Sequence, residues 1–226
     1  MIILMKPTTY IFDLDGTLLN TLEDLSSSVN HAMEQCHYPT HSTDRVREMV
    51  GNGVRRLIER AVPQGTPADD TQRALSIFQE YYLAHNEDKT QPYDGILPML
   101  RALKQRECKI AVVSNKFDKA TKALCQKYFP DLIDVAIGEN ESQGIRKKPH
   151  PDMVALALQQ LSSSAGEAVY IGDSEVDIAT AQNSDLPCIS VLWGFRTKDF
   201  LSSHGARILV DKPSDIINLS VKPLRS

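Results

Sequence analysis

The sequence has few cysteines, and none of them lie close together. Four cysteines occur in 226 residues, with no CxxC pair, so the chain lacks the spacing of a zinc finger or a thioredoxin-type redox motif. The six histidines share no spacing typical of a metal cluster. We interpret the cysteines as reduced, mostly buried thiols of a cytosolic protein; they are Cys36, Cys108, Cys125 and Cys188.

Long apolar runs and an excess of positive charge are also absent. The apolar start of the chain ends at Lys6 and Pro7, too early for a signal peptide or a membrane span. No other segment approaches the roughly 20 apolar residues that a spanning helix needs. The net charge of -4 argues against a nucleic-acid-binding surface. We therefore expect a cytoplasmic protein with no membrane or nucleic-acid partner.

The first third of the chain reads as a run of helices. In residues 21–36, apolar residues recur at spacings of three and four, which is typical of an amphipathic helix. Thr21 with Asp24 three residues on resembles a capping box. Further helices are predicted at 43–50, from 54 onward and at 68–85, with no convincing strand among them. This pattern indicates a helical insertion.

From Tyr93 onward, helices and strands are predicted to alternate. Such alternation favours a parallel sheet covered by helices on both faces. The fold class expected is α/β, a doubly wound Rossmann-like parallel sheet core formed by residues 1–18 plus 87–226, with an inserted α-helical cap domain at 19–86. The predicted helices are 96–106, 116–128, 151–161 and 175–183, and the predicted strands are 109–113, 132–137, 168–171, 188–192 and 207–210.

The most informative segment is Thr9–Leu18, where a short apolar run ends in Asp13, Leu14, Asp15, Gly16 and Thr17. The run predicts a buried strand, and active sites of open α/β sheets lie at the carboxyl ends of their strands. Alternation along an extended chain sends both aspartates to the same side, where they can bind a hard cation and share acid/base work. The alternative is an acidic turn that merely ends a strand.

Three later segments have the same character. Ile110–Asn115 is an apolar run that ends in Ser114, Lys148-Pro149-His150-Pro151 follows, and Gly172–Asp177 comes after the apolar run 168–171. Together and in this order, the four segments resemble the motifs of the haloacid dehalogenase superfamily of aspartate-nucleophile phosphatases. They anchor nearly the whole chain in the family's order, and the finer resemblance is to its phosphoglycolate phosphatase-like branch.

The resemblance implies roles for the core residues. Asp13, as the first aspartate of its motif, is the expected nucleophile, and aspartyl-phosphate intermediates are an established form of covalent catalysis. Asp15 is the expected general acid and base; the alternative is a helix N-cap. Ser114 and the backbone N–H of Asn115 are expected to donate to the phosphoryl oxygens. Lys148 is chosen over its neighbour Lys147 by the Lys-Pro-x-Pro pattern.

Mg²⁺ is the expected cofactor, because it takes oxygen ligands and keeps several waters. The family implies the Asp13 side chain and the Asp15 backbone carbonyl as ligands, together with Asp173. Asp177 lies one helical turn further on and is expected to reach the site directly or through water. The alternative for Asp177 is a carboxylate that only stabilises a helix N-terminus.

The remaining expectations concern the substrate. Gly51, Asn52 and Gly53, followed by Arg55, resemble a stretch of phosphoglycolate phosphatases and form a plausible anion site at a helix start. An ordinary turn between helices explains them equally well. The segment Trp193–Arg196 follows a strand end, where a loop could border the active site; the interpretation we favour is aromatic packing on the sheet.

These observations predict a Mg²⁺-dependent phosphatase of a small phosphorylated metabolite, with 2-phosphoglycolate as the leading substrate and an aspartyl-phosphate intermediate. Within the superfamily, an inorganic pyrophosphatase, a sugar phosphatase or a phosphosugar mutase are the alternatives. A catalytically silent module that binds a phosphorylated ligand or a protein is the alternative of another class. The sequence leaves the physiological substrate open, and it is compatible with a monomer or a homodimer.

Overall fold

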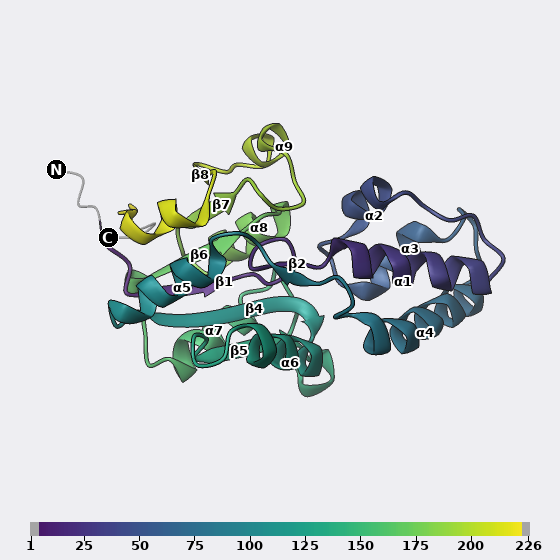
Figure 1. Cartoon of the computed structure of the whole chain (residues 1–226), viewed down its shortest axis with the longest axis horizontal. Helices are drawn as coiled ribbons and strands as arrows, with labels where there is room; N and C mark the ends of the chain where they lie inside the picture. Colours follow the sequence, from purple (N-terminus) through teal and green to yellow (C-terminus); the bar gives the residue numbers. More distant parts are fainter. Residues whose placement is uncertain (1–4, 223–226) are drawn as a thin grey trace. The chain divides into compact units, whose positions relative to one another are not determined.

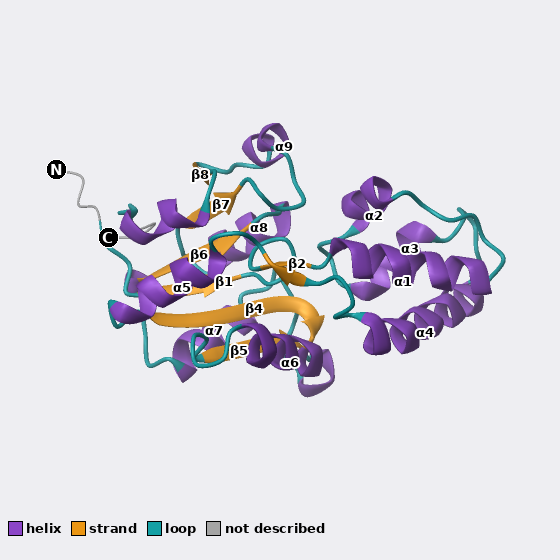
Figure 2. Cartoon of the chain, viewed as in Figure 1, coloured by secondary structure: helices purple, strands orange, loops and turns teal. Residues whose placement is uncertain are grey.

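The computed structural model describes residues 5–222, and the apolar start at residues 1–4 therefore lies outside the described part. The chain divides into two compact units. One unit is Leu19–Gln91, and the other joins Met1–Leu18 to Pro92–Ser226. Figures 1 and 2 show that helices dominate the first unit, whereas the second contains the large sheet. We refer to them as the helical unit and the core unit.

The core unit contains a six-stranded sheet in the order β5-β4-β1-β6-β7-β8. The strands of this sheet pair in parallel, and the central strand β1 pairs with both β4 and β6. The carboxyl ends of β4, β1 and β6 therefore meet at the same edge of the sheet. The strands are β1 (Thr9–Phe12), β4 (Lys109–Phe117), β5 (Val135–Glu139), β6 (Ala168–Gly172), β7 (Cys188–Val191) and β8 (Ile208–Val210).

Helices cover both faces of this sheet. Successive residues of β1, such as Tyr10, Ile11 and Phe12, point to opposite faces and are all buried. On the Ile11 face, α7 packs through Met153 and neighbouring apolar residues. The expected α/β fold with a parallel, Rossmann-like core is confirmed. The helices are α5 (Ile96–Gln105), α6 (Asp118–Tyr128), α7 (Asp152–Gln160), α8 (Glu175–Asn183) and α9 (Lys198–Ser203).

The helical unit has its own apolar core. Val29 and Met33 of α1 pack with Ile58 of α3 and Phe78 of α4, and all four are buried. The helices are α1 (Leu22–Gln35), α2 (Thr43–Met49), α3 (Val54–Ala61) and α4 (Ala68–His85). Two short strands, β2 (Leu19–Asn20) and β3 (Gln91–Pro92), form a separate sheet.

The predicted capping box at the start of α1 is wrong. Thr21 is the N-cap residue, but its side chain makes no capping hydrogen bond. Asp24 instead accepts hydrogen bonds from the backbone N–H groups of Lys89 and Thr90 and from the Thr90 hydroxyl, at 2.7–3.1 Å. Local spacing suggested a local contact, whereas the carboxylate binds a segment far along the chain.

Several elements of the core unit also differ from the prediction. Strand β5, expected at 132–137, is Val135–Glu139. Strand β4 continues through Lys116 and Phe117, where the sequence analysis expected helix, and its pairing with β5 is irregular between Val113 and Phe117. Helix α9 was not predicted. Among the helices of residues 5–222, none combines the length and apolar character needed to span a bilayer.

Candidate active site

The carboxyl ends of the central strands lie side by side in the core unit, and the motif residues gather there. Asp13 follows β1, Ser114 and Asn115 lie in the last part of β4, and Asp173 follows β6. Lys148 lies in the turn before α7. All of them are buried, with at most 8% of each residue exposed. The sheet order β4-β1-β6 thus brings together segments from three distant parts of the sequence.

Lys148 links two carboxylates at the centre of this cluster. Its Nζ atom lies 2.8 Å from Asp13 Oδ1 and 2.8 Å from Asp177 Oδ1. The backbone of Lys148 is held by the side chain of Asn115, which donates to the Lys148 carbonyl at 3.1 Å and accepts from its N–H at 2.8 Å. Lys147, in contrast, is partly exposed and lies 3.6 Å from Glu141. The Asn115 side chain therefore positions the buried lysine.

Asp177 has both of its oxygens occupied by protein groups. Oδ1 accepts from Lys148 and from the Tyr170 hydroxyl, and Oδ2 accepts from the backbone N–H and hydroxyl of Ser174. The Ser174 contacts form a capping box at the start of α8. Gly172 permits this arrangement, because a Cβ atom there would lie 2.3 Å from Asp177 Cγ. Asp177 thus contacts the start of α8 and the buried ammonium group of Lys148 at once.

Asp173 is enclosed between the turn after β1 and the loop after β7. Its Oδ1 accepts from the Thr17 hydroxyl at 3.2 Å, and its Oδ2 accepts from the backbone N–H of Phe195 at 2.7 Å. A Cβ atom on Gly194 would lie 2.3 Å from Asp173 Cβ, and one on Gly16 would lie 2.5 Å from Asp173 Oδ2. Both glycines allow the backbone to approach this carboxylate closely.

The interpretation of Trp193–Arg196 as simple aromatic packing on the sheet is therefore incomplete. Besides the Phe195 contact, the Trp193 indole N–H donates to the Thr17 carbonyl at 2.9 Å. Arg196 forms an ion pair with Glu175 at 3.2 Å. Trp193, Phe195 and Arg196 border the candidate site, which is the alternative that sequence reasoning considered and did not favour. The available signal was a glycine between aromatic residues directly after a strand end.

Electrostatics in this cluster favour binding of a cation. Asp13, Asp173 and Asp177 offer carboxylate oxygens that all lie within 4.8 Å of one another. Burial, and then the charge of Asp177, raise the pKa of Asp13 well above its usual range, against the pull of Lys148. Burial and Asp177 also raise the pKa of Asp173 to about 7. A divalent cation would offset this repulsion, and oxygen donors are the ligands that Mg²⁺ prefers.

Lys148 keeps its charge in this environment. Burial by itself would lower the pKa of its ammonium group, because desolvation disfavours the charged form. The charges of Asp13 and Asp177 outweigh burial and raise that pKa well above its ordinary value. The cluster therefore contains a fixed positive charge beside the Asp13 carboxylate.

Asp15 forms an ion pair with a second buried lysine, Lys116. The Lys116 Nζ atom lies 3.0 Å from Asp15 Oδ1, and both side chains are largely buried, with 3% and 15% exposed. Lys116 also donates its backbone N–H to the Ser114 hydroxyl oxygen at 3.2 Å. Sequence reasoning assigned Lys116 to a helix and gave it no role. Its position directly after Ser114 and Asn115 was the only signal.

The residues expected to bind substrate from the insertion lie in the helical unit. Gly51 and Gly53 both have positive φ angles, and Gly53 is the N-cap residue of α3. The Asn52 side chain accepts from Arg60 at 2.8 Å, and Arg60 also donates to the Met49 carbonyl.

Arg55, the remaining residue of this set, donates to Gln72 at 3.0 Å at the surface of the same unit. The turn at residues 51–53 is therefore braced from within the helical unit, with Arg60 as its brace.

Comparison with known proteins identifies the family. A model of the haloacid dehalogenase-like hydrolases matches residues 10–191. The chain belongs to this family. It is 31% identical to a phosphoglycolate phosphatase of Caulobacter vibrioides, over 98% of this chain and 94% of that protein. A phosphoglycolate phosphatase of Nitrosococcus oceani is 29% identical over 99% of this chain and 98% of its own length.

Solved structures agree with this assignment. A crystal structure from Lactobacillus delbrueckii subsp. bulgaricus superposes with a TM-score of 0.90 at 36% identity, covering 94% of this chain and 98% of that one. A predicted phosphoglycolate phosphatase of Haemophilus somnus superposes with a TM-score of 0.84 at 26% identity, covering 93% and 96%. Family and relatives together indicate that this haloacid dehalogenase-like hydrolase is a phosphoric monoester hydrolase.

Proposed function

We propose that this hydrolase is a Mg²⁺-dependent phosphatase that cleaves 2-phosphoglycolate to glycolate and phosphate through an aspartyl-phosphate intermediate. The observation that supports it best is the buried Asp13 carboxylate, paired with Lys148 beside Asp173 and Asp177. A phosphate dianion repels nucleophiles, so its cleavage requires charge neutralisation and an aligned attacking atom. The cluster has a fixed cation, an acidic ligand set and a carboxylate nucleophile in one place.

In this proposal, Asp13 attacks phosphorus and becomes phosphorylated, and the alkoxide leaves. Lys148 neutralises the phosphoryl oxygens as well as Asp13, because its ammonium group already lies 2.8 Å from the Asp13 carboxylate. The Ser114 hydroxyl accepts from the Lys116 N–H, so its own hydrogen is available to donate toward a phosphoryl oxygen. The Asn115 N–H is the second proposed donor, while its side chain fixes Lys148.

Asp15 is the proposed general acid and base. It would protonate the departing alkoxide and later accept a proton from the water that hydrolyses the phosphorylated Asp13. Lys116 holds the Asp15 carboxyl by an ion pair with Nζ at 3.0 Å from Oδ1. A silent binding module has no use for this second carboxyl, so its presence favours the enzyme over the binding module.

The acidic cluster fits a magnesium ion. Asp13 and Asp173, with the Asp15 backbone carbonyl, are the proposed ligands. The bound ion would supply charge neutralisation for the phosphoryl group. Asp177 is proposed to act mainly through Lys148, because its two oxygens already accept four hydrogen bonds. The proposed cap domain comprises about residues 19–86 of the helical unit, and its Gly51–Gly53 turn and Arg55 are proposed to contact the rest of the substrate.

A screen of the purified protein tests the proposal. The panel contains 2-phosphoglycolate, sugar phosphates, a phosphosugar mutase substrate and inorganic pyrophosphate, each assayed with Mg²⁺ and with excess chelator. We expect phosphate release that requires Mg²⁺ and is fastest with 2-phosphoglycolate. A different preferred compound would replace the substrate assignment, and full activity in chelator would remove the metal from the proposal. Inactivity on the whole panel would favour the binding module.

A further inference from the structure

Lys116, which pairs with the motif residue Asp15, has itself no part in the family motifs by which the sequence was interpreted. Only 3% of the Lys116 side chain is exposed, and its ammonium group lies 3.0 Å from Asp15. Burying a cation has a large cost unless it is well paired. Asp15, the carboxylate of this pair, is partly exposed, whereas Lys148 lies between the buried carboxylates of Asp13 and Asp177.

We propose that Lys116 binds the carboxylate of the substrate and so selects phosphate esters of small hydroxy acids. This inference rests on the proposed function, because it assigns a residue to the recognition of that substrate. It concerns the leaving group, whereas Lys148 serves the phosphoryl group. The two buried lysines then divide the substrate's two anionic groups between them.

The position of Lys116 follows from the role of Asp15. A general acid must come within hydrogen-bond reach of the leaving oxygen, about 2.6–3.2 Å. The Lys116 ammonium is in direct contact with that acid, so it lies on the leaving-group side of the site. In 2-phosphoglycolate, a single methylene separates the ester oxygen from the carboxylate. A cation next to Asp15 is therefore next to the place where this carboxylate must lie.

Charge balance supports the same assignment. A phosphorylated hydroxy acid brings its carboxylate close to Asp15, which becomes ionised as it gives its proton to the departing alkoxide, and the two like charges then repel strongly in a largely buried site. An ammonium group is a compact cation that can donate to more than one anion at a time. Lys116 can thus contact both carboxylates and offset their repulsion. A substrate with a neutral end gains nothing from this cation.

Local structure holds Lys116 in place. Its backbone N–H donates to the Ser114 hydroxyl oxygen, and its carbonyl accepts from the Thr121 hydroxyl at 3.3 Å. The irregular pairing of β4 with β5 lies in the same segment, between Val113 and Phe117. Such irregularities re-aim side chains at the end of a strand. The side chain is therefore presented by a fixed backbone, as specificity for a small substrate requires.

The experiment compares two substrates of equal length, 2-phosphoglycolate and 2-hydroxyethyl phosphate, which differ in the charge at the far end. Lys116→Met removes the cation and keeps the length of the side chain, and Lys147→Met is the matched control at a partly exposed lysine. We expect Lys116→Met to lower kcat/KM for 2-phosphoglycolate about 10- to 100-fold more than for 2-hydroxyethyl phosphate, chiefly through KM. Lys147→Met should leave the ratio of the two substrates unchanged.

Inhibition by glycolate provides a readout that does not depend on the chemical step. We expect glycolate to inhibit the wild type, with 2-hydroxyethyl phosphate as substrate, and to inhibit Lys116→Met far less. If Lys116→Met does not fold, Lys116→Gln replaces it, and Lys116→Arg should restore much of the preference for 2-phosphoglycolate because it keeps the charge.

Equal losses on both substrates would overturn the inference, because a lysine that only orients Asp15 affects every ester alike. Unchanged kinetics of Lys116→Met would overturn it too. If the wild type hydrolyses 2-hydroxyethyl phosphate with the same kcat/KM as 2-phosphoglycolate, the enzyme does not recognise the carboxylate and this inference is wrong. The proposal that the protein is a phosphatase would not be affected. A wild type inactive on both esters and on the wider panel defeats the proposed function itself.

Discussion

At the scale of single residues, the site depends on a few buried charges that are each held by specific partners. Lys148 contacts Asp13 and Asp177 and is itself positioned by Asn115. Truncating one member of such a network leaves the others buried without their partner. The resulting loss in the free energy of unfolding is larger than the net contribution of the ion pair. Conservative substitutions that keep the shape are therefore the informative ones.

The first prediction concerns Asp13. Asp13→Asn should abolish turnover, because an amide does not attack phosphorus and is a weak metal ligand. The fold should persist, since Lys148 keeps its contact with Asp177 and the substitution removes a carboxylate whose pKa burial has raised. The measurements are phosphate release and circular dichroism. Near-wild-type activity in a correctly folded variant would remove Asp13 from the role of nucleophile.

At the scale of elements, glycines and strand ends determine which groups can meet. Gly172 ends β6 and lies against Asp177, which also caps α8. Gly194, after β7, lies against Asp173. In the helical unit, a buried carboxylate has a comparable role: Asp24 of α1 accepts hydrogen bonds from the backbone N–H groups of Lys89 and Thr90.

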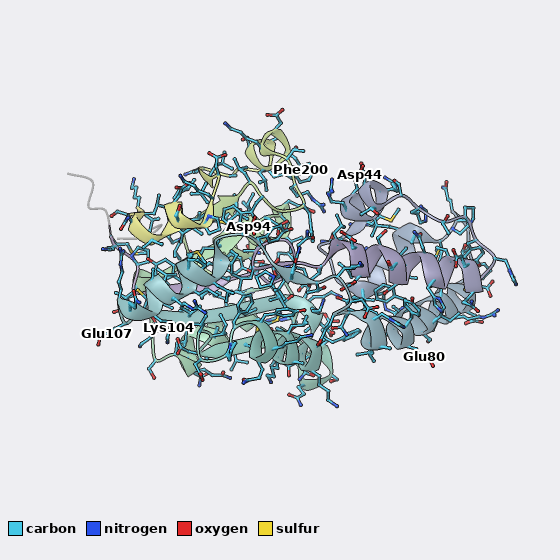
Figure 3. The ribbon with its side chains drawn as sticks, viewed as in Figure 1. Asp44, Glu80, Asp94, Lys104, Glu107 and Phe200 are labelled. Atoms are coloured by element: carbon cyan, nitrogen blue, oxygen red, sulfur yellow. The ribbon has the colours of Figure 1, made fainter. Side chains whose placement is uncertain are left out.

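The second prediction concerns these hydrogen bonds of Asp24. Asp24→Ala should destabilise the helical unit by about 1–3 kcal/mol, because it leaves the Lys89 and Thr90 donors without the acceptor that binds them. Asp44→Ala is the matched control: Asp44 lies on α2, is labelled in Figure 3, has 82% of its side chain exposed and pairs with Arg47 at the surface. We expect the control to change stability by less than about 0.5 kcal/mol. Urea denaturation measures both, and equal effects would contradict the assignment.

At the scale of the whole molecule, a parallel sheet gathers carboxylates that the sequence separates. The order β4-β1-β6 places the ends of three strands at one edge, and the three aspartates there repel one another. Folding thus gathers carboxylates that could hold a metal ion, and binding of a cation there should stabilise the folded core unit.

The third prediction concerns this linkage. Mg²⁺ at about 100 times its dissociation constant should stabilise the protein by about 2.7 kcal/mol, measured as a rise in Tm. The pKa of Asp173 is raised to about 7, chiefly by burial. Protonation competes with the metal below that pH, so the affinity for Mg²⁺ should be highest above pH 7. Below pH 7, the affinity for Mg²⁺ should fall about tenfold per pH unit if metal binding displaces one proton.

Isothermal titration at pH 8, 7 and 6 measures the affinity directly, with no need for catalysis. Asp152→Asn is the control, because this carboxylate is paired with Arg146 outside the cluster and its pKa is lowered to about 2. The control should follow the wild type at every pH. An affinity that does not change between pH 8 and pH 6 would show that Asp173 does not titrate in competition with the metal.

The sequence by itself determined the class of fold and the main motifs. Apolar runs that end in polar residues located β1 and β6, and the helical periodicity located α4 and α8 with the bounds that the structure has. These features are local, because strand and helix periodicities and turn residues act over a few positions. Resemblance then assigned roles to Asp13, Asp15, Lys148 and Asp173, and these assignments remain proposals.

Only the tertiary structure decided which partners these groups have. No local pattern shows that Lys116 faces Asp15 across 101 positions, that Asp24 binds Lys89 and Thr90, or that Phe195 donates to Asp173. Such contacts follow from the order of strands in the sheet and from where its connections return. Their strength depends on burial, because a charge that is weakly screened inside the protein acts strongly on its neighbours. Burial is a property of the packed chain, and no single segment carries it.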